Sequence, residues 1–289
     1  MVQAQLGVIG GSGLYSIEGM RDMAEVAIDT PFGKPSDVIT VGTLAGARVA
    51  FLPRHGRGHY ITPTEVNSRG NIWALKMLGV THVVSVSACG SLREELRPRD
   101  VVVPDQLIDF TRAGRKNTFF GEGIVVHIGF AEPFCRHLSR LVAEGVRRAG
   151  GTVHLGGTFV TVEGPRFSTK AESAMFRNWN ADIIGMTASP EAQLAREAEL
   201  CYAVMGHVTD YDVWREASEA VSVETIVANL QANTDLAKRA ISNLAELFPL
   251  QRSCECADAL RNAIITNPAR LPEERRDQLS LLLDKHLPR

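Results

Sequence analysis

The sequence predicts a single α/β domain with a central mixed β-sheet flanked by helices. Short apolar runs that are typical of buried strands alternate along the chain with stretches of helical periodicity. No linker rich in proline, glycine or serine divides the 289 residues, of which 45% are hydrophobic. We expect the main body of the domain to span residues 1–250 and a helical C-terminal extension of the same domain to span 251–289.

Composition excludes several classes of partner. The 31 basic and 33 acidic residues leave a net charge of -2, too balanced to attract nucleic acid or an anionic membrane. No apolar run is long enough to span a bilayer, and the N-terminus lacks the features of a signal peptide. We therefore expect a cytoplasmic protein with five mostly reduced cysteines and no nucleic-acid or membrane partner.

The expected elements follow from local patterns. The expected strands are 6–9, 37–44, 48–52, 82–88, 100–103, 152–162, 181–186 and 201–207; 37–44 and 48–52 form a hairpin, and 20–28 is irregular or strand-like. The expected helices are 64–78 capped by Thr64, one from Pro133 to Ala149, one ending at Trp179, one opening at 187–191, and a long one over 222–247. Two amphipathic helices, 254–265 and 272–287, would form the tail, and 110–123 would be a long loop.

Small and basic residues follow several strands. The glycine-rich turn at 10–13 can hold a phosphate with help from the Ser12 hydroxyl, or it is a plain tight turn. A dinucleotide fingerprint is not completed, because Ser16 stands where G-x-G-x-x-G needs glycine. Arg54 and His55 lie on a basic loop after a strand, and the planar guanidinium suits phosphate oxygens; a plain solvated loop is the alternative. Ligands of open α/β sheets bind at such strand ends, where Ser87 and Ala88 also lie.

Other strand-end residues could hold a flat or sugar-like body. Phe167 could lie against a planar ring, and Thr187 opens a helix where an anion would be held. Asp210 and Asp212 would point the same way on an extended chain, where they could bind the amine or N–H groups of a base. Their alternative role is to cap the next helix or to pair with Arg215.

No metal site or catalytic nucleophile is evident in the sequence. The histidines at 55 and 59 have no cysteine or carboxylate neighbour in a ligand pattern, and no serine or cysteine stands in a triad or elbow motif. His127 is either a ligand contact or a structural histidine. Cys254 and Cys256 are either ordinary thiols or a strained, easily reduced disulfide, and a reducing cytosol favours thiols.

Seven motifs in register resemble one family. They are 7–14 (GVIGGSGL), 53–57 (PRHGR), 71–76 (NIWALK), 87–92 (SACGSL), 131–135 (AEPFC), 163–169 (EGPRFST) and 209–212 (TDYD). Together they resemble the methylthioadenosine phosphorylase branch of the trimeric purine nucleoside phosphorylases, over about residues 5–250. The tail from 251 is less informative, although its C-x-C pair resembles some prokaryotic members.

The resemblance implies a set of site residues. It places phosphate at Ser12, Arg54, His55, Ser87, Ala88 and Thr187. It places the nucleoside against Phe167, Met186, Ile184 and Thr209, and the 5′ substituent against His127, Val223, Ile226 and Val227, with a neighbouring subunit capping that pocket. Asp210 and Asp212 would be the catalytic pair: Asp210, protonated, would serve as the acid at purine N7, and Asp212 would read the 6-amino group.

The resemblance also implies an activity. This is phosphorolysis of S-methyl-5′-thioadenosine to adenine and 5-methylthioribose 1-phosphate, in purine and methionine salvage. Phosphate would be a co-substrate, no cofactor or metal would be needed, and the chain would form a homotrimer or a hexamer. Three alternatives stay open: a broader or 6-oxopurine nucleoside phosphorylase, a dinucleotide-dependent oxidoreductase, and a non-catalytic nucleoside-binding protein.

Overall fold

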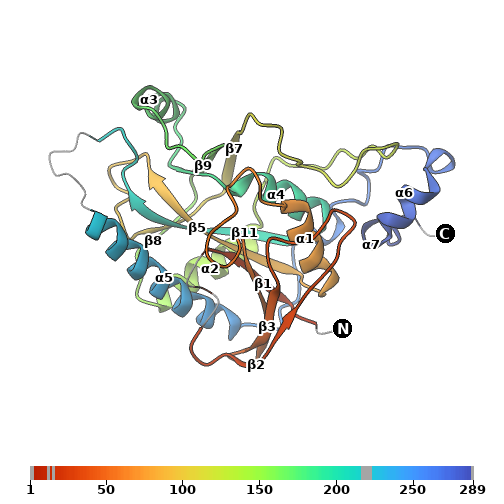
Figure 1. Ribbon diagram of the computed structural model, residues 1–289, viewed down its shortest axis with the longest axis horizontal. Coiled ribbons are helices and arrows are strands. Elements are labelled where there is room, and N and C mark those ends of the chain that lie inside the picture. Colours follow the sequence, from red (N-terminus) through yellow and green to blue (C-terminus); the bar gives the residue numbers. More distant parts are fainter. Residues whose placement is uncertain (1–2, 12–13, 15–16, 216–222, 288–289) are drawn as a thin grey trace.

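Figure 1 shows the computed structural model of the chain. It describes residues 3–11, 14, 17–215 and 223–287, with side chains described from residue 228 onward in the last range. The strands are β1 (Leu6–Gly10), β2 (Arg21–Val26), β3 (Ile39–Leu44), β4 (Ala47–Pro53), β5 (His82–Ser91), β6 (Val101–Val103), β7 (Gln106–Phe110), β8 (Val153–Leu155), β9 (Thr158–Val162), β10 (Ile183–Gly185) and β11 (Cys201–Asp210). The longer helices are α1 (Ser68–Met77), α2 (Arg136–Arg148), α3 (Lys170–Asn178), α4 (Ala188–Glu197) and α5 (Val223–Ala245).

The long strands β5 and β11 organise the sheet. β5 runs parallel to β1 on one side and to β11 on the other, and its last residues pair antiparallel with β10. The order β2-β3-β4-β1-β5-β10-β9-β7 is extended by β11, β6 and β8, which branch from β5. The sheet is therefore mixed, and the predicted α/β fold is confirmed. Because β1, β4, β5 and β11 are parallel, their carboxyl ends lie at one edge.

Helices cover both faces of the sheet, and buried side chains alternate between the two layers. Along β11, Cys201 and Ala203 join the core under α2 and α5, whereas Tyr202 and Val204 join the core under α1 and α4. Successive side chains of β11 point to opposite faces, and both faces are buried. For this reason the β11 sequence is a continuous apolar run.

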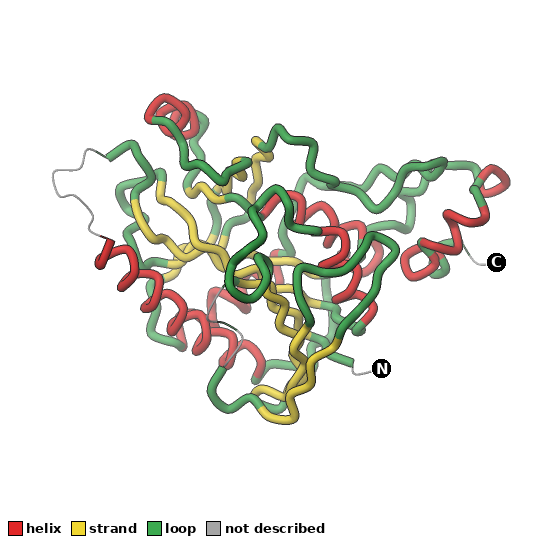
Figure 2. The backbone as a smooth tube through the Cα atoms, viewed as in Figure 1, coloured by secondary structure: helices red, strands yellow, loops and turns green. Residues whose placement is uncertain are grey.

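Several element boundaries differ from the sequence-based expectation. Helix α1 begins at Ser68 rather than at 64, because the Asn67 side chain accepts from the Gly70 N–H and caps the helix. Helix α2 begins after Cys135 rather than at Pro133. The expected strand 152–162 is two strands, because Gly156 and Gly157 adopt φ values of 102° and 104°. The segment between β7 and α2 contains no helix or named strand (Figure 2).

The tail is less helical than expected. Instead of two amphipathic helices it contains two 3₁₀ turns, Glu255–Asp258 and Pro268–Arg270, and the short helices α6 (Glu273–Gln278) and α7 (Ser280–Leu283). Four of its leucines, Leu260, Leu279, Leu282 and Leu283, are buried in the core layer of α1 and α4. Among the described residues, no helix combines the length and apolarity needed to cross a membrane.

Candidate active site

A cavity of about 340 Å³ lies where the carboxyl ends of β4, β5 and β11 meet β10 and the loop after β9. The predicted residues that line it are Arg54, His55, Ser87, Ala88, Phe167, Ile184, Met186, Thr187, Thr209, Asp210 and Asp212. They come from segments far apart in the sequence, and the fold brings their side chains into one cavity at the strand ends.

The remaining predicted residues are not placed there. Ser12 lies outside the described residues, as do the side chains of Val223, Ile226 and Val227. His127 lies on a different surface, beside Glu255, Asp258 and Arg261. Within one chain, His127 does not reach the cavity.

A buried ion pair holds Arg54 at one end of the cavity. Its Nε and Nη2 donate to the two carboxylate oxygens of Glu191, at 2.5 and 3.2 Å. Nη1 donates to the Val86 carbonyl at 3.0 Å, and Nη2 also donates to Ser85 Oγ at 2.6 Å. Both charged side chains are almost fully buried, so the guanidinium has a fixed orientation.

Glu191 is a site-supporting residue that the sequence did not reveal. It accepts further hydrogen bonds from Ser85 Oγ at 3.0 Å and from the Tyr202 hydroxyl at 2.8 Å. Burial, followed by the negative charge of Glu191, raises the pKa of Tyr202, which keeps that hydroxyl a donor. A glutamate in the first turn of a helix usually caps or neutralises the helix end, so its local pattern gave no hint of this contact with β4 and β5.

His55 is neutral at pH 7 and has a defined tautomer. Burial, and then the adjacent Arg54 charge, lowers its pKa to about 4. Nδ1 lies 2.9 Å from the Ile61 carbonyl. Because a carbonyl only accepts, Nδ1 carries the proton and Nε2 keeps a lone pair. His59, which the sequence analysis did not assign to the site, lines the cavity and stacks on His55 with ring centroids 4.5 Å apart.

A pair of hydroxyls continues this end of the cavity. Ser87 Oγ lies 3.1 Å from Thr187 Oγ1. Thr187 directly precedes α4, whose first turn is interrupted by the non-helical dihedral angles of Ser189 (φ −102°, ψ 132°), and its side chain faces Ser87. Two neighbouring hydroxyls in a cavity that Arg54 also lines form a site suited to an anion.

The middle of the cavity is bounded by Met186. Its side chain packs over Gly164, where a Cβ would meet Met186 Sδ at 2.4 Å and where φ is 65°. Arg115 donates to the Met186 carbonyl at 2.6 Å and pairs with Glu163 at 2.9 Å. Arg115 and Glu163 thus fix the backbone of the segment on which Met186 stands; neither was predicted as a site residue.

Asp210 is held by its neighbours at the other end of the cavity. Its Oδ1 accepts the Asp212 backbone N–H at 2.8 Å, and its Oδ2 lies 2.6 Å from Thr209 Oγ1. Thr209 Oγ1 also lies 3.2 Å from the Cys89 carbonyl. The Thr209 hydroxyl has one proton, so it donates either to Asp210 Oδ2 or to the Cys89 carbonyl.

Asp212 reaches the same cavity by a turn rather than by strand alternation. Strand β11 ends at Asp210, and Asp212 has a φ of 49°. Its Oδ2 is buried and has no hydrogen-bond partner among the described residues. The Ser173 hydroxyl lies beside Asp212 without reaching hydrogen-bonding geometry. Burial, and further the negative charge of Asp210, raises the pKa of Asp212.

The segment carrying these acids is anchored from outside. Trp214 Nε1 donates to the Ser91 carbonyl at 2.7 Å, and the Arg177 guanidinium lies 3.6 Å from the centre of the Trp214 ring. The sequence offered an ion pair between Arg215 and the aspartates as an alternative. Instead, the Arg215 guanidinium stacks on the Tyr211 ring. Phe167 lines the cavity but is 77% exposed, so it stands at the mouth.

The chain matches the family described as "Phosphorylase superfamily" over residues 5–246. It belongs to the phosphorylase superfamily. Among its superfamily relatives, S-methyl-5′-thioadenosine phosphorylase of Geobacter sulfurreducens is 51% identical over 98% of this chain and 99% of its own. The protein of the same name from Koribacter versatilis is 50% identical over 99% of this chain and 97% of its own.

Solved superfamily structures have the same fold. A methylthioadenosine phosphorylase from an antarctic soil metagenomic library superimposes with a TM-score of 0.94 and 44% identity, over 98% of this chain and 100% of the other. The methylthioadenosine phosphorylase of Schistosoma mansoni in complex with adenine gives a TM-score of 0.83 at 35% identity, over 90% of this chain and 99% of the other. The cavity therefore belongs to a phosphorylase-superfamily domain.

Proposed function

We propose that the protein is an S-methyl-5′-thioadenosine phosphorylase that releases adenine and 5-methylthioribose 1-phosphate. The cavity supports this reaction because it has an anion-binding end at Arg54, Ser87 and Thr187 and a pair of acids at its other end. Relatives of that name match nearly the whole chain. Inorganic phosphate is the co-substrate, and the reaction needs no organic cofactor or metal.

The Asp212 carboxylate, which lines the cavity, determines which purine base is preferred. An ionised carboxylate only accepts hydrogen bonds, so it favours a base that presents an N–H group. The 6-amino group of adenine supplies such a donor. The 6-oxo group of hypoxanthine is an acceptor, so it could not form a hydrogen bond with the Asp212 carboxylate, which also only accepts.

The reaction joins the two ends of the cavity. A phosphate oxygen forms a bond to C1′ of the ribose while the bond between C1′ and purine N9 breaks, and the bonding electrons leave with the purine. Positive charge develops on the sugar, and a negative phosphate beneath it stabilises that charge. Arg54, oriented by Glu191, fixes the nucleophile, and this positioning provides much of the rate enhancement.

The leaving purine must gain a proton or a strong hydrogen bond at N7. We assign this role to protonated Asp210, which lines the cavity and is held in place by the Thr209 hydroxyl and the Asp212 backbone N–H. Neutral His55 has its Nε2 lone pair available to accept from a phosphate hydroxyl or a ribose hydroxyl. Asp212 then orients the base through its 6-amino group.

We further propose that the chain acts in the cytoplasm as a homotrimer or a hexamer, in purine and methionine salvage. Val223, Ile226 and Val227 would line the 5′ pocket of each chain, and His127 of a neighbouring subunit would cap it. The backbone N–H of His127 donates to the Ala263 carbonyl at 2.9 Å, so the tail holds His127 at the surface. Light scattering coupled to gel filtration measures the assembly.

A substrate panel tests the proposal. Purified protein is assayed with methylthioadenosine, adenosine, methylthioinosine and inosine, with and without phosphate. We expect phosphate-dependent release of adenine, fastest from methylthioadenosine. A clear preference for methylthioinosine or inosine would overturn the assignment of Asp212, and base release without phosphate would overturn phosphorolysis.

A further inference from the structure

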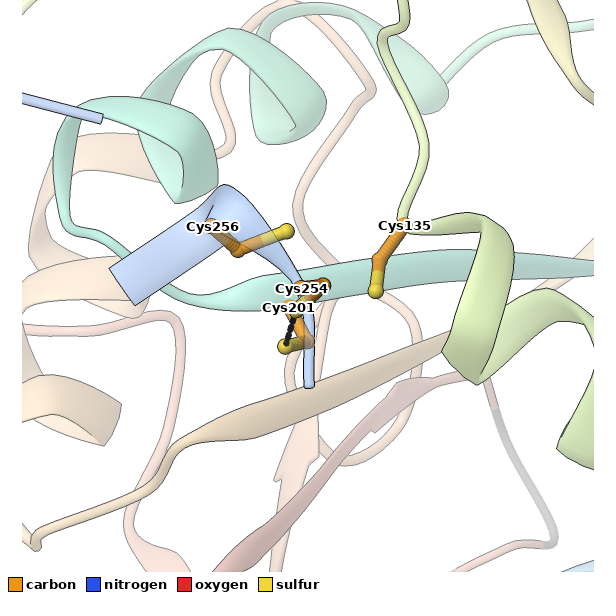
Figure 3. Close-up of side chains that lie close together, drawn as sticks. All are labelled: Cys135, Cys201, Cys254 and Cys256. Atoms are coloured by element: carbon orange, nitrogen blue, oxygen red, sulfur yellow. Dashed lines mark hydrogen bonds between the residues drawn. The ribbon is translucent and has the colours of Figure 1, made fainter. Parts of the chain in front are cut away.

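Four cysteines form a compact cluster outside the cavity. Cys135 precedes α2, Cys201 opens β11, and Cys254 and Cys256 lie in the tail, so three remote segments converge (Figure 3). Their sulfur atoms all lie within 4.8 Å of one another. Cys135, Cys201 and Cys256 are buried, Cys254 is half-buried, and all four are free thiols.

The spacing of these sulfur atoms suits a tetrahedral metal ion. A Zn–S bond of about 2.3 Å places the sulfurs of a tetrathiolate site about 3.8 Å apart. The closest pair, Cys201 and Cys254, is 3.3 Å apart, and the whole cluster lies within 4.8 Å. Closure onto an ion therefore needs only small side-chain movements.

The backbone presents the two tail cysteines from one place. Cys254 is extended, with φ −117° and ψ 162°, and is followed at once by the 3₁₀ turn that contains Cys256. Cys254 and Cys256 are separated by one residue, and both sulfur atoms lie on the same side of the tail. They face Cys135, which precedes α2, and Cys201 of β11 (Figure 3).

Positive charge and dipoles surround the cluster. Arg196 Nη1 lies 3.9 Å from Cys256 Sγ. Cys135 is the N-cap residue of the thirteen-residue helix α2, and its side chain makes no capping hydrogen bond. A guanidinium and a helix N-terminus both favour thiolates over thiols. They offset part of the doubly negative charge of a divalent ion with four thiolates.

We propose that Cys135, Cys201, Cys254 and Cys256 form a structural Zn²⁺ site that fastens the C-terminal tail to β11 and α2. Soft thiolates select zinc over the hard cations magnesium and calcium, and four protein ligands leave no open position for catalysis. Binding exchanges four thiol protons for one Zn²⁺, without any change in oxidation state. The ion ties the tail to the core, and the same tail packs against the segment that carries His127.

Metal analysis tests this site directly. The full chain is produced without an affinity tag in zinc-supplemented medium, purified with a phosphine reductant, and dialysed against metal-free buffer. Mass spectrometry of the elements should find about one zinc per chain in the wild type. Cys256→Ala should reduce zinc at least tenfold. Cys89→Ala is the matched control and should keep the full content, because Cys89 is buried but lies outside the cluster.

A second readout keeps the test independent of the folding of the variants. Wild-type protein stripped of zinc and given cobalt(II) should show the strong visible absorption of tetrahedral cobalt thiolates, and zinc should abolish that absorption. Wild-type protein with zinc no higher than in Cys256→Ala would overturn the proposal. So would cysteines linked by disulfides in the reductant-treated protein, or equal zinc loss from Cys89→Ala and Cys256→Ala.

Discussion

The Arg54 guanidinium and the Glu191 carboxylate form a buried two-point ion pair at one end of the cavity. The arginine follows β4 and the glutamate stands in α4, so the pair links the sheet to a helix that lies on its face. Removing one member of such a pair leaves the other charge buried without compensation.

Glu191→Gln should weaken phosphate use far more than nucleoside binding. The amide oxygen can still accept from Ser85, Tyr202 and Arg54 Nη2, but the substitution removes the negative charge and the acceptor for Arg54 Nε. We expect kcat/KM for phosphate to fall about a hundredfold, and the free energy of unfolding to fall by about 3 kcal/mol. Steady-state kinetics with each substrate varied, and urea denaturation, measure these effects.

Glu25→Gln is the matched control for Glu191→Gln. Glu25 pairs with Arg57 at 2.6 Å, and both side chains are largely exposed. Exposed ion pairs contribute little, so we expect a change within about 0.5 kcal/mol and unchanged phosphate kinetics. Equal effects of the two substitutions would contradict the role of the buried pair.

Asp210→Asn should abolish most of the activity on methylthioadenosine. An amide cannot act as the acid at N7, and losing general acid catalysis costs on the order of a hundredfold to ten-thousandfold. Asp235→Asn is the control, because Asp235 is exposed on α5 and contacts only Gln231 in the described hydrogen bonds. A near-wild-type rate for Asp210→Asn would show that Asp210 is not the acid at purine N7.

Asp212→Asn should shift the substrate preference from 6-aminopurine toward 6-oxopurine nucleosides. The asparagine amide can donate to a 6-oxo group, which the aspartate cannot. We expect the ratio of kcat/KM for methylthioadenosine over methylthioinosine to fall at least tenfold. An unchanged ratio would show that Asp212 does not read position 6 of the purine.

His55 should contribute to acid sensitivity. Its pKa is about 4 in the folded protein and near 6.5 in an unfolded chain. As the pH falls from about 6.5 to about 4, the unfolded state binds a proton that the folded state does not, so the free energy of unfolding decreases. His55→Asn removes this contribution and keeps a donor for the Ile61 carbonyl.

The difference between His55→Asn and wild type is the quantity to measure, because other groups titrate over the same range. Urea denaturation at a series of pH values gives the free energy of unfolding of each protein. The variant should gain stability relative to wild type as the pH falls through this window. A difference that stays constant with pH would exclude the burial of a neutral His55.

Gly90→Ala should disturb both acids at once. A Cβ there would lie 3.2 Å from Asp210 Oδ1, 3.3 Å from Asp212 Cβ and 3.1 Å from Ile184 Cγ2. We expect kcat/KM to fall about tenfold and the free energy of unfolding to fall by about 1–3 kcal/mol. Gly129→Ala is the stability control, because its Cβ would meet nothing within 4 Å; equal destabilisation by the two would contradict the crowding argument.

Sequence patterns predicted best those features that depend on a single strand or turn. The apolar run of β11, the hairpin of β3 and β4, and the small or basic residues after β4 and β5 all predicted the observed elements. Element ends were less predictable. The start of α1 depends on the Asn67 side chain, which also donates to the Phe32 and Lys34 carbonyls across 35 and 33 residues.

The partners across the fold could not be predicted from local patterns. Nothing near Glu191 indicates that it binds Arg54, and nothing near Cys135 or Cys201 indicates that the tail brings two more thiols to them. Parallel strand ends must meet at one edge of a sheet, so the place of the cavity followed from the chain's alternation of strands and helices. Which buried charges and sulfurs meet was decided by how the helices and the tail pack, because those contacts join residues far apart in the chain.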